Sequence, residues 1–267
     1  MIEVPSIFES WSLETFQLPR RSHLYSLSPA GLATDAIESL TSYLTRLAEA
    51  HRVSVRKLLD EKILLLLKPP RTFKYEIQSA QSWLAATPEV AKAVECLRRL
   101  TLRQDLQHLT LLPWQHQLST PSVFHDVQPF CPVCFEEARN TDAAVYEPLL
   151  WTLEAVKVCL RHRRYLQFCC TYCGRKQPFL KLEARPGHCA HCGSWLGLEL
   201  PFFVSTEPEE LDWHINLAQM LGQRLQAAWQ RTNQSLSKAK RSKQAQKPSL
   251  MSLLESRYEL DEIKLVY

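Results

Sequence analysis

Residues 131–192 read CPVCFEEARNTDAAVYEPLLWTLEAVKVCLRHRRYLQFCCTYCGRKQPFLKLEARPGHCAHC, and this stretch decides the fold. It contains cysteine and histidine residues in four pairs, each with two residues between its members. The pairs are Cys131/Cys134, Cys159/His162, Cys170/Cys173 and Cys189/Cys192. At this spacing a tight turn directs two side chains at one tetrahedral metal ion. The sequence therefore predicts two zinc ions per chain.

The intervals between successive pairs are 24, 7 and 15 residues. If neighbouring pairs share an ion, the first site has three cysteines and one histidine, and the second has four cysteines. A catalytic zinc keeps one position open for water, whereas both of these sets supply four protein ligands. We therefore expect structural zinc. Because such sites contribute roughly 10–16 kcal/mol in peptides, we do not expect this region to fold without metal.

Nine cysteines also invite a disulfide interpretation, which the opening of the chain disfavours. Residues 1–11 carry two glutamates and no apolar run, so we expect no signal peptide and a reducing, cytoplasmic compartment. Cys96 lies in the helical pattern AKAVECLRRL and is predicted to be a core thiol. Cys169 has no partner pair, so neither of these two cysteines is predicted to be a ligand.

Composition excludes several functional classes. With 267 residues and 45% hydrophobic content, the chain can form two compact units. Its longest apolar run, residues 63–67, is far short of the roughly 20 residues that span a bilayer. Neither a GxxxxGK[ST] loop nor a GxGxxG turn occurs, and neither does HExxH or an HxE before a CxxC pair. We therefore expect a protein that is not an enzyme and that depends on a partner for any use of ATP.

The net positive charge of the chain is small, but one segment is strongly basic. The net charge is +4, but residues 161–185 contain seven cations and a single acid, Glu183. We predict a basic face on the metal scaffold that contacts nucleic acid or a partner. Its proposed contact residues are Arg161, Arg163, Arg164, Arg175 and Lys176.

The predicted fold class is mainly α with small zinc-bound β elements. Asp35 and Glu38 have the spacing of a capping box, Ser54 is placed to cap a second helix, and residues 151–155 alternate as in a short strand. The predicted organisation has an extended arm at 1–33, a helix-turn-helix-like domain at 34–128, a double zinc domain at 129–200, an amphipathic helix at 205–230, and a basic linker and tail at 231–267.

Residues 47–59, LAEAHRVSVRKLL, match a helix-turn-helix. The sequence differs from the helix-turn-helix pattern at Arg52, a position that glycine usually occupies. The left-handed conformation needed there costs a residue other than glycine about 1 kcal/mol. Two interpretations remain open. In one, Arg56 and Lys57 read DNA; in the other, the two helices form a hairpin that only packs.

Three passages resemble the TniQ/TnsD family of transposon target-selection proteins. They are residues 18–59, especially ESLTSYLTRLAEAH, then CPVC at 131–134 with WTLEAVKVCLRHRRYLQFCCTYCG at 151–174, and CAHCGSWL at 189–196. Together they cover about half of the chain, and the metal pattern is their most specific part.

The resemblance implies a non-enzymatic adaptor that joins a target-recognising element to an AAA+ ATPase regulator, TnsC, and through it to the transposase. Only 75 residues follow Cys192, whereas long TnsD-like members add a large DNA-binding region. We therefore expect the guide-RNA version, in which a bacterial CRISPR effector complex locates the target DNA. Arg20 and Arg21 in the arm are predicted to contact the ATPase.

Two other functions compete with this one. A RING-like ubiquitin ligase module uses a similar ligand order, but its first and third pairs share an ion, and the seven residues between His162 and Cys170 exceed its usual spacing. The second competing function is that of a zinc-containing regulator that binds a specific DNA sequence without guide RNA.

Overall fold

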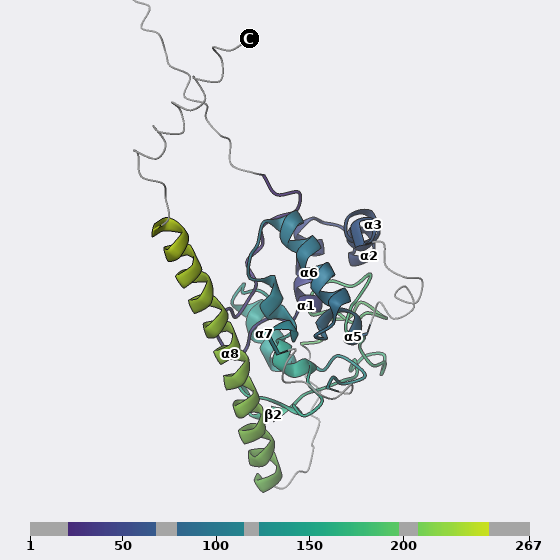
Figure 1. The fold of residues 1–267 in the computed structure, drawn as a ribbon. Coiled ribbons are helices and arrows are strands. Elements are labelled where there is room, and N and C mark those ends of the chain that lie inside the picture. The colour runs from purple at the N-terminus through teal and green to yellow at the C-terminus, as the bar shows by residue number, and fades with distance from the viewer. Residues whose placement is uncertain (1–20, 68–78, 115–122, 198–207, 246–267) are drawn as a thin grey trace, which may run out of the picture.

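The computed structural model describes residues 21–67, 79–114, 123–197 and 208–245. Across these ranges the chain is mainly helical and includes a two-stranded sheet, β1–β2 (Figure 1). This confirms the predicted fold class. None of the described helices is long and apolar enough to cross a bilayer.

The amino-terminal helices pack their apolar faces together. Helix α1 begins after Ser39, whose side chain accepts a hydrogen bond from the backbone N–H of Ser42. The capping box predicted at Asp35 and Glu38 is therefore wrong, because residues 37–39 pair with another segment instead of entering the helix. The elements are α1 (Leu40–Ala50), α2 (Val55–Leu58), the π-helix η1 (Leu59–Ile63), α3 (Leu64–Leu67), α5 (Gln81–Leu84) and α6 (Pro88–Thr101).

A short turn connects α1 to α2 and contains one residue with a positive φ. Arg52 adopts the left-handed conformation, with φ of 55°. Ser54 caps α2 by accepting a hydrogen bond from the N–H of Lys57. A non-glycine residue therefore occupies the strained position, as the sequence predicted.

The rest of the body consists of short elements between irregular loops. Residues 151–155 do not form the predicted strand, because Leu149–Thr152 is a short 3-10 helix with all its residues buried. Within that helix, the buried hydroxyl of Thr152 donates a hydrogen bond to the carbonyl of Leu149. The elements are η2 (Leu106–Leu109), η3 (Leu112–Trp114), α7 (Pro132–Asn140), η4 (Leu149–Thr152), β1 (Val158–Cys159) and β2 (Arg164–Tyr165).

A backbone joint connects the helices to the cysteine-rich region. The N–H of Leu149 donates to the carbonyl of Ile37 at 2.7 Å, and the N–H of Ser39 donates to the carbonyl of Glu147 at 3.0 Å. The buried residues on both sides belong to one continuous hydrophobic cluster. The predicted ranges 34–128 and 129–200 thus share a core.

Two buried ion pairs flank this joint. The Lys181 ammonium, with its side chain 2% exposed, lies 2.6 Å from the carboxylate of Glu147. Glu38 contacts Arg46 and also accepts a hydrogen bond from Ser42. Burial raises the pKa of Glu38 to about 7 despite the opposing effect of Arg46.

Helix α8 (Pro208–Ala245) lies along one side of the body (Figure 1). Gly222 permits its close approach, since a Cβ atom there would lie 2.9 Å from the side chain of Asp35. The helix is longer than the predicted 205–230, because residues 231–245 continue it and are not a linker. That stretch contains no glycine or proline and is rich in lysine, glutamine and alanine, which favour helix.

We expect Lys181→Met to lower the free energy of unfolding by roughly 3–5 kcal/mol, because it leaves the Glu147 carboxylate buried without its partner. Urea unfolding at a fixed zinc concentration measures the loss. The double variant Lys181→Met/Glu147→Gln removes the stranded charge and should recover much of the stability. A single variant as stable as the parent would contradict a structural role for the pair.

Candidate metal centre

The eight predicted ligands form two clusters. Cys131, Cys134, Cys159 and His162 form the first cluster, and Cys170, Cys173, Cys189 and Cys192 form the second. Neighbouring pairs therefore combine, as predicted, and the first and third pairs do not share a cluster as in a RING domain. All nine cysteines are free thiols. Cys96 is buried and Cys169 is exposed, and neither belongs to a cluster.

The ligand atoms have the separations that a tetrahedral zinc ion requires. Bonds of ~2.3 Å to sulfur and ~2.0 Å to nitrogen place two sulfurs ~3.8 Å apart, and a sulfur and a nitrogen ~3.5 Å apart. The sulfur pairs in contact are 3.6–3.8 Å apart. The Nδ1 atom of His162 lies 3.2–3.6 Å from the sulfurs of the first cluster. The ligand atoms of each cluster all lie within 4.8 Å of one another, so either cluster could hold a metal ion.

The first cluster joins a helix to a hairpin. Cys131 precedes α7, and Cys134 lies in its first turn. Cys159 is on β1, and the turn before β2 carries His162. Arg163 completes that turn in the left-handed conformation, with φ of 46°. Metal binding here therefore fixes the hairpin against α7.

A carboxylate lies beside the imidazole of the first cluster. Glu137 lies one turn after Cys134 on α7, and its Oε1 atom is 3.0 Å from Nε2 of His162. The contact with His162 is the largest cause that lowers the pKa of Glu137, and the charge of Arg161 lowers it further. A carboxylate on the second nitrogen orients a metal-binding histidine and leaves Nδ1 free to coordinate. Glu137 was not among the predicted site residues, although its position three residues after Cys134 indicates that both side chains lie on one face of a helix.

The thiols of the first cluster also interact with one another. Contacts from Cys131 and Cys134 lower the pKa of Cys159, and the contact with Cys131 raises the pKa of Cys134. Cysteine coordinates metal as the thiolate, so metal binding must release the remaining protons. We therefore expect acidification to weaken metal binding.

The second cluster is built from two matching knuckles of sequence CxxCG. Gly174 donates its N–H to the carbonyl of Cys170 at 2.9 Å, and Gly193 makes the same bond to Cys189 at 3.1 Å. Both glycines have φ near +70°. Glycine adopts this left-handed conformation at little cost, which explains its place after each second cysteine.

A buried glutamine connects the two knuckles. Gln177 is fully buried, and its amide nitrogen donates to the sulfur of Cys189 at 3.3 Å and to the carbonyl of Arg175 at 3.0 Å. Its amide oxygen accepts from the N–H of Ala190 at 3.0 Å. Hydrogen bonds to a ligand sulfur orient it and stabilise the thiolate. Only the place of Gln177 between the two knuckles could have indicated this role from the sequence.

The predicted basic face is divided between the two clusters. Arg161 and Arg163 lie beside the first cluster and pair with Glu137 and Asp212, each at 2.8 Å. Arg164 is half-buried on β2. Arg175 and Lys176 are exposed on the second cluster, and no ion pair joins them to another residue of the described ranges.

The other predicted contact residues lie apart from the metal. The backbone N–H of Arg56 donates to the carbonyl of Leu182, and its guanidinium contacts Glu183 at 2.5 Å. The first turn of α2 thus contacts the metal region at Leu182 and Glu183, while the side chains of Arg56 and Lys57 stay exposed. Lys57 lies 3.9 Å from Glu61, which is on η1. Arg21 is exposed, and Arg20 lies outside the described residues.

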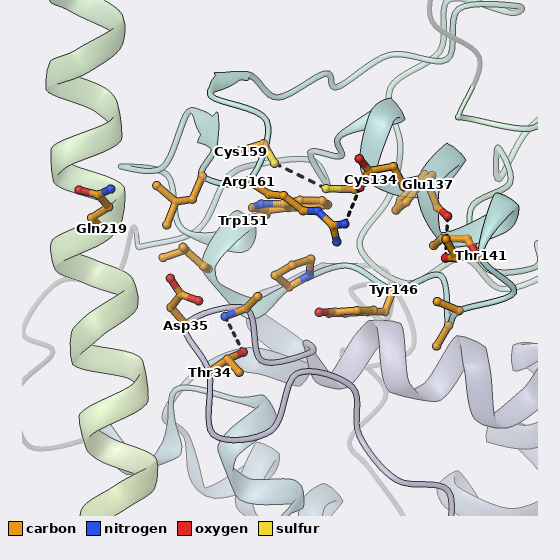
Figure 2. Close-up of a pocket in the computed structure, with 18 residues that line it drawn as sticks. Thr34, Asp35, Cys134, Glu137, Thr141, Tyr146, Trp151, Cys159, Arg161 and Gln219 are labelled. Atoms are coloured by element: carbon orange, nitrogen blue, oxygen red, sulfur yellow. Dashed lines mark hydrogen bonds and ion pairs between the residues drawn. The ribbon is translucent and has the colours of Figure 1, made fainter.

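A cavity of about 640 Å³ adjoins the first cluster. It lies between α7 and α8, with Cys134 and Cys159 in its wall and Gln219 on the side of α8 (Figure 2). Arg161, which pairs with Glu137, also lines it. Helix α8 therefore borders this cavity through Gln219.

Together these features define a helical protein with two clusters of cysteine and histidine that could each hold a metal ion, in a common core. The family model TniQ matches residues 29–166, which are 138 of the 267 residues, and the chain belongs to this family. The match includes all four ligands of the first cluster and ends before the second. No curated protein matches the chain. Membership of the TniQ family indicates a target-selection or adaptor role in transposition.

We expect purified protein to contain two zinc ions per chain, measured by native mass spectrometry and metal analysis. Cys134→Ser should lose the ion of the first cluster and Cys173→Ser that of the second, because each variant removes one of four ligands. One equivalent or none in the parent protein would contradict the assignment.

We expect Gln177→Leu to release zinc at least tenfold faster than the parent into a chromogenic chelator, since outer-shell hydrogen bonds typically change metal affinity 10–100-fold. Gln167→Leu is the matched control, because Gln167 pairs with Phe130 through its backbone. If the parent and Gln177→Leu release zinc at the same rate, Gln177 has no role in holding the metal.

Proposed function

We propose that this protein is a non-enzymatic adaptor of DNA transposition whose two clusters each bind a structural zinc ion. It links a CRISPR effector with its guide RNA, bound at target DNA, to a TnsC-like AAA+ ATPase, and thereby recruits the transposase. Membership of the TniQ family is the observation that carries this proposal. Zinc is the metal best suited to sets of three or four cysteines held at these separations.

The ligand sets support a structural role for the metal. Each cluster has four protein ligands, so a bound ion has no open position at which to activate water or a substrate. Glutamate often serves as a general base in enzymes. Beside the first cluster, however, the carboxylate of Glu137 lies within ion-pair distance of His162 and Arg161. The chemistry available at these clusters is therefore binding and positioning.

The arrangement of the body also suits an adaptor. One core carries several separate surfaces: the segment at Arg21, the α1–α2 unit, the exposed cations of the second cluster, and the outer face of α8. When one rigid body holds two partners, the second binding event is intramolecular and each contact can be weak. We assign the arm to the ATPase and the basic residues to nucleic acid or the effector.

Independent reading of DNA by α2 is the less favoured function. Arg52 has the left-handed conformation that a helix-turn-helix would need at its turn, but a recognition helix inserts its first turn into the major groove. Here Leu182 accepts a hydrogen bond from that turn, and Glu183 contacts Arg56. This packing supports the hairpin interpretation. Filter binding to random and target DNA over a range of salt concentrations would detect sequence preference by the isolated protein.

Reconstitution with transposase, ATPase and guided effector tests the proposal. We expect guided insertion to require this protein, and Arg175→Ala/Lys176→Ala to reduce its assembly with the other components while its zinc content stays at two. Arg224→Ala changes an exposed cation on α8 and is the matched control. Undiminished insertion without the protein, or nuclease or ligase activity in the pure chain, would overturn the adaptor role.

A further inference from the structure

The outer end of the second cluster is an exposed surface that the metal site itself does not require. We call it the knuckle tip, and it consists of Tyr172, Gly174, Arg175, Lys176, His191 and Gly193. A Cβ atom built on either glycine would meet no atom within 4 Å. The tip is therefore open to an incoming ligand.

The backbone of the tip is fixed. The N–H of Cys170 donates to the carbonyl of Arg175 at 3.0 Å, and the same carbonyl accepts from the buried amide of Gln177. The ring of His191 donates through Nε2 to the carbonyl of Lys176 at 2.8 Å, which connects the two knuckles across the tip. Side chains mounted on such a scaffold lose little backbone entropy when they bind.

Tyr172 is the most exposed large hydrophobic side chain of the described residues. It is 82% exposed, although it lies between two metal ligands in a tightly bonded turn. Arg175 and Lys176 have one evident structural role, because four thiolates around a divalent ion leave a net charge of about −2 that cations offset. Tyr172 has no comparable role, since its ring neither fills the core nor contributes charge.

The surroundings of the tip favour a polyanion. The sequence contains no aspartate or glutamate between Glu154 and Glu183, and the exposed cations of the tip lie close in sequence to the exposed ring. An aromatic ring beside cations is the combination that binds single-stranded nucleic acid, in which bases stack on the ring and phosphates meet the cations. Paired bases in a duplex do not offer their faces to such a ring.

We propose that the knuckle tip binds unpaired nucleotides, with one base stacked on Tyr172 and the adjoining phosphates contacting Arg175 and Lys176. This inference rests on the proposed function and deepens it, because it specifies single-stranded nucleic acid as a ligand of the adaptor. Guide RNA and a displaced DNA strand share the required chemistry.

The test measures binding of the full-length, zinc-loaded protein to fluorescent 12-nucleotide probes by anisotropy. The probes are mixed-sequence RNA, DNA of the same sequence, and the corresponding DNA duplex. We expect at least one single strand to bind more tightly than the duplex, and the preferred strand identifies RNA or DNA as the source. Tyr172→Ala should weaken that binding about tenfold, within the range for loss of one stacked base, whereas Tyr172→Trp should preserve it. Lys176→Ala should lower the salt dependence by the ~0.7 expected per phosphate contact.

Trp213→Ala is the matched control, because Trp213 is an aromatic residue 60% exposed on α8. Zinc content is measured for every variant, so that loss of the metal site is not mistaken for loss of stacking. Binding by Tyr172→Ala equal to that of the parent, or no preference for either single strand over the duplex, would overturn the inference. Such a result would leave the adaptor role intact if guided insertion still required the protein.

Discussion

The pairing of residues 37–39 with residues 147–149 is the constraint on which the rest of the structure depends. It joins the start of α1 to the segment between the two halves of the first cluster, and the buried pair of Lys181 and Glu147 reinforces it from the second cluster. Backbone groups buried at this joint must find partners, so neither side can form it alone. The metal clusters and the helices are therefore parts of one cooperative unit.

Trp195 packs the second cluster against the first. Its indole nitrogen donates to Glu136 on α7 at 2.8 Å, and its ring occupies the space that side chains on Gly187 and Gly197 would fill. The second cluster is thereby held against α7, the helix that contains Cys134 and begins directly after Cys131. For an adaptor this rigidity has a direct use, since surfaces on different elements keep a fixed geometry toward their partners.

Much of this organisation was predictable because its signals are local. The CxxC and CxxH pairs gave both ligand sets, and the left-handed turn at Arg52 followed from its place in the helix-turn-helix pattern. The non-local features were not predictable. The start of α1 depends on pairing with residues more than a hundred positions away, and that pairing displaced the capping box expected at Asp35. Gln177 and the ion pair of Arg163 with Asp212 likewise depend on tertiary contacts, which single-residue patterns do not encode.

Hydrogen exchange in α1, measured with zinc bound and after removal of zinc by a chelator, tests this cooperative unit most directly. Helix α1 contributes no metal ligand, so its protection reports only on the coupling through the joint. If metal and helices form one unit, removing zinc should accelerate exchange in Leu40–Ala50 together with residues 131–192. Unchanged protection of α1 while residues 131–192 lose theirs would show that the two regions fold independently.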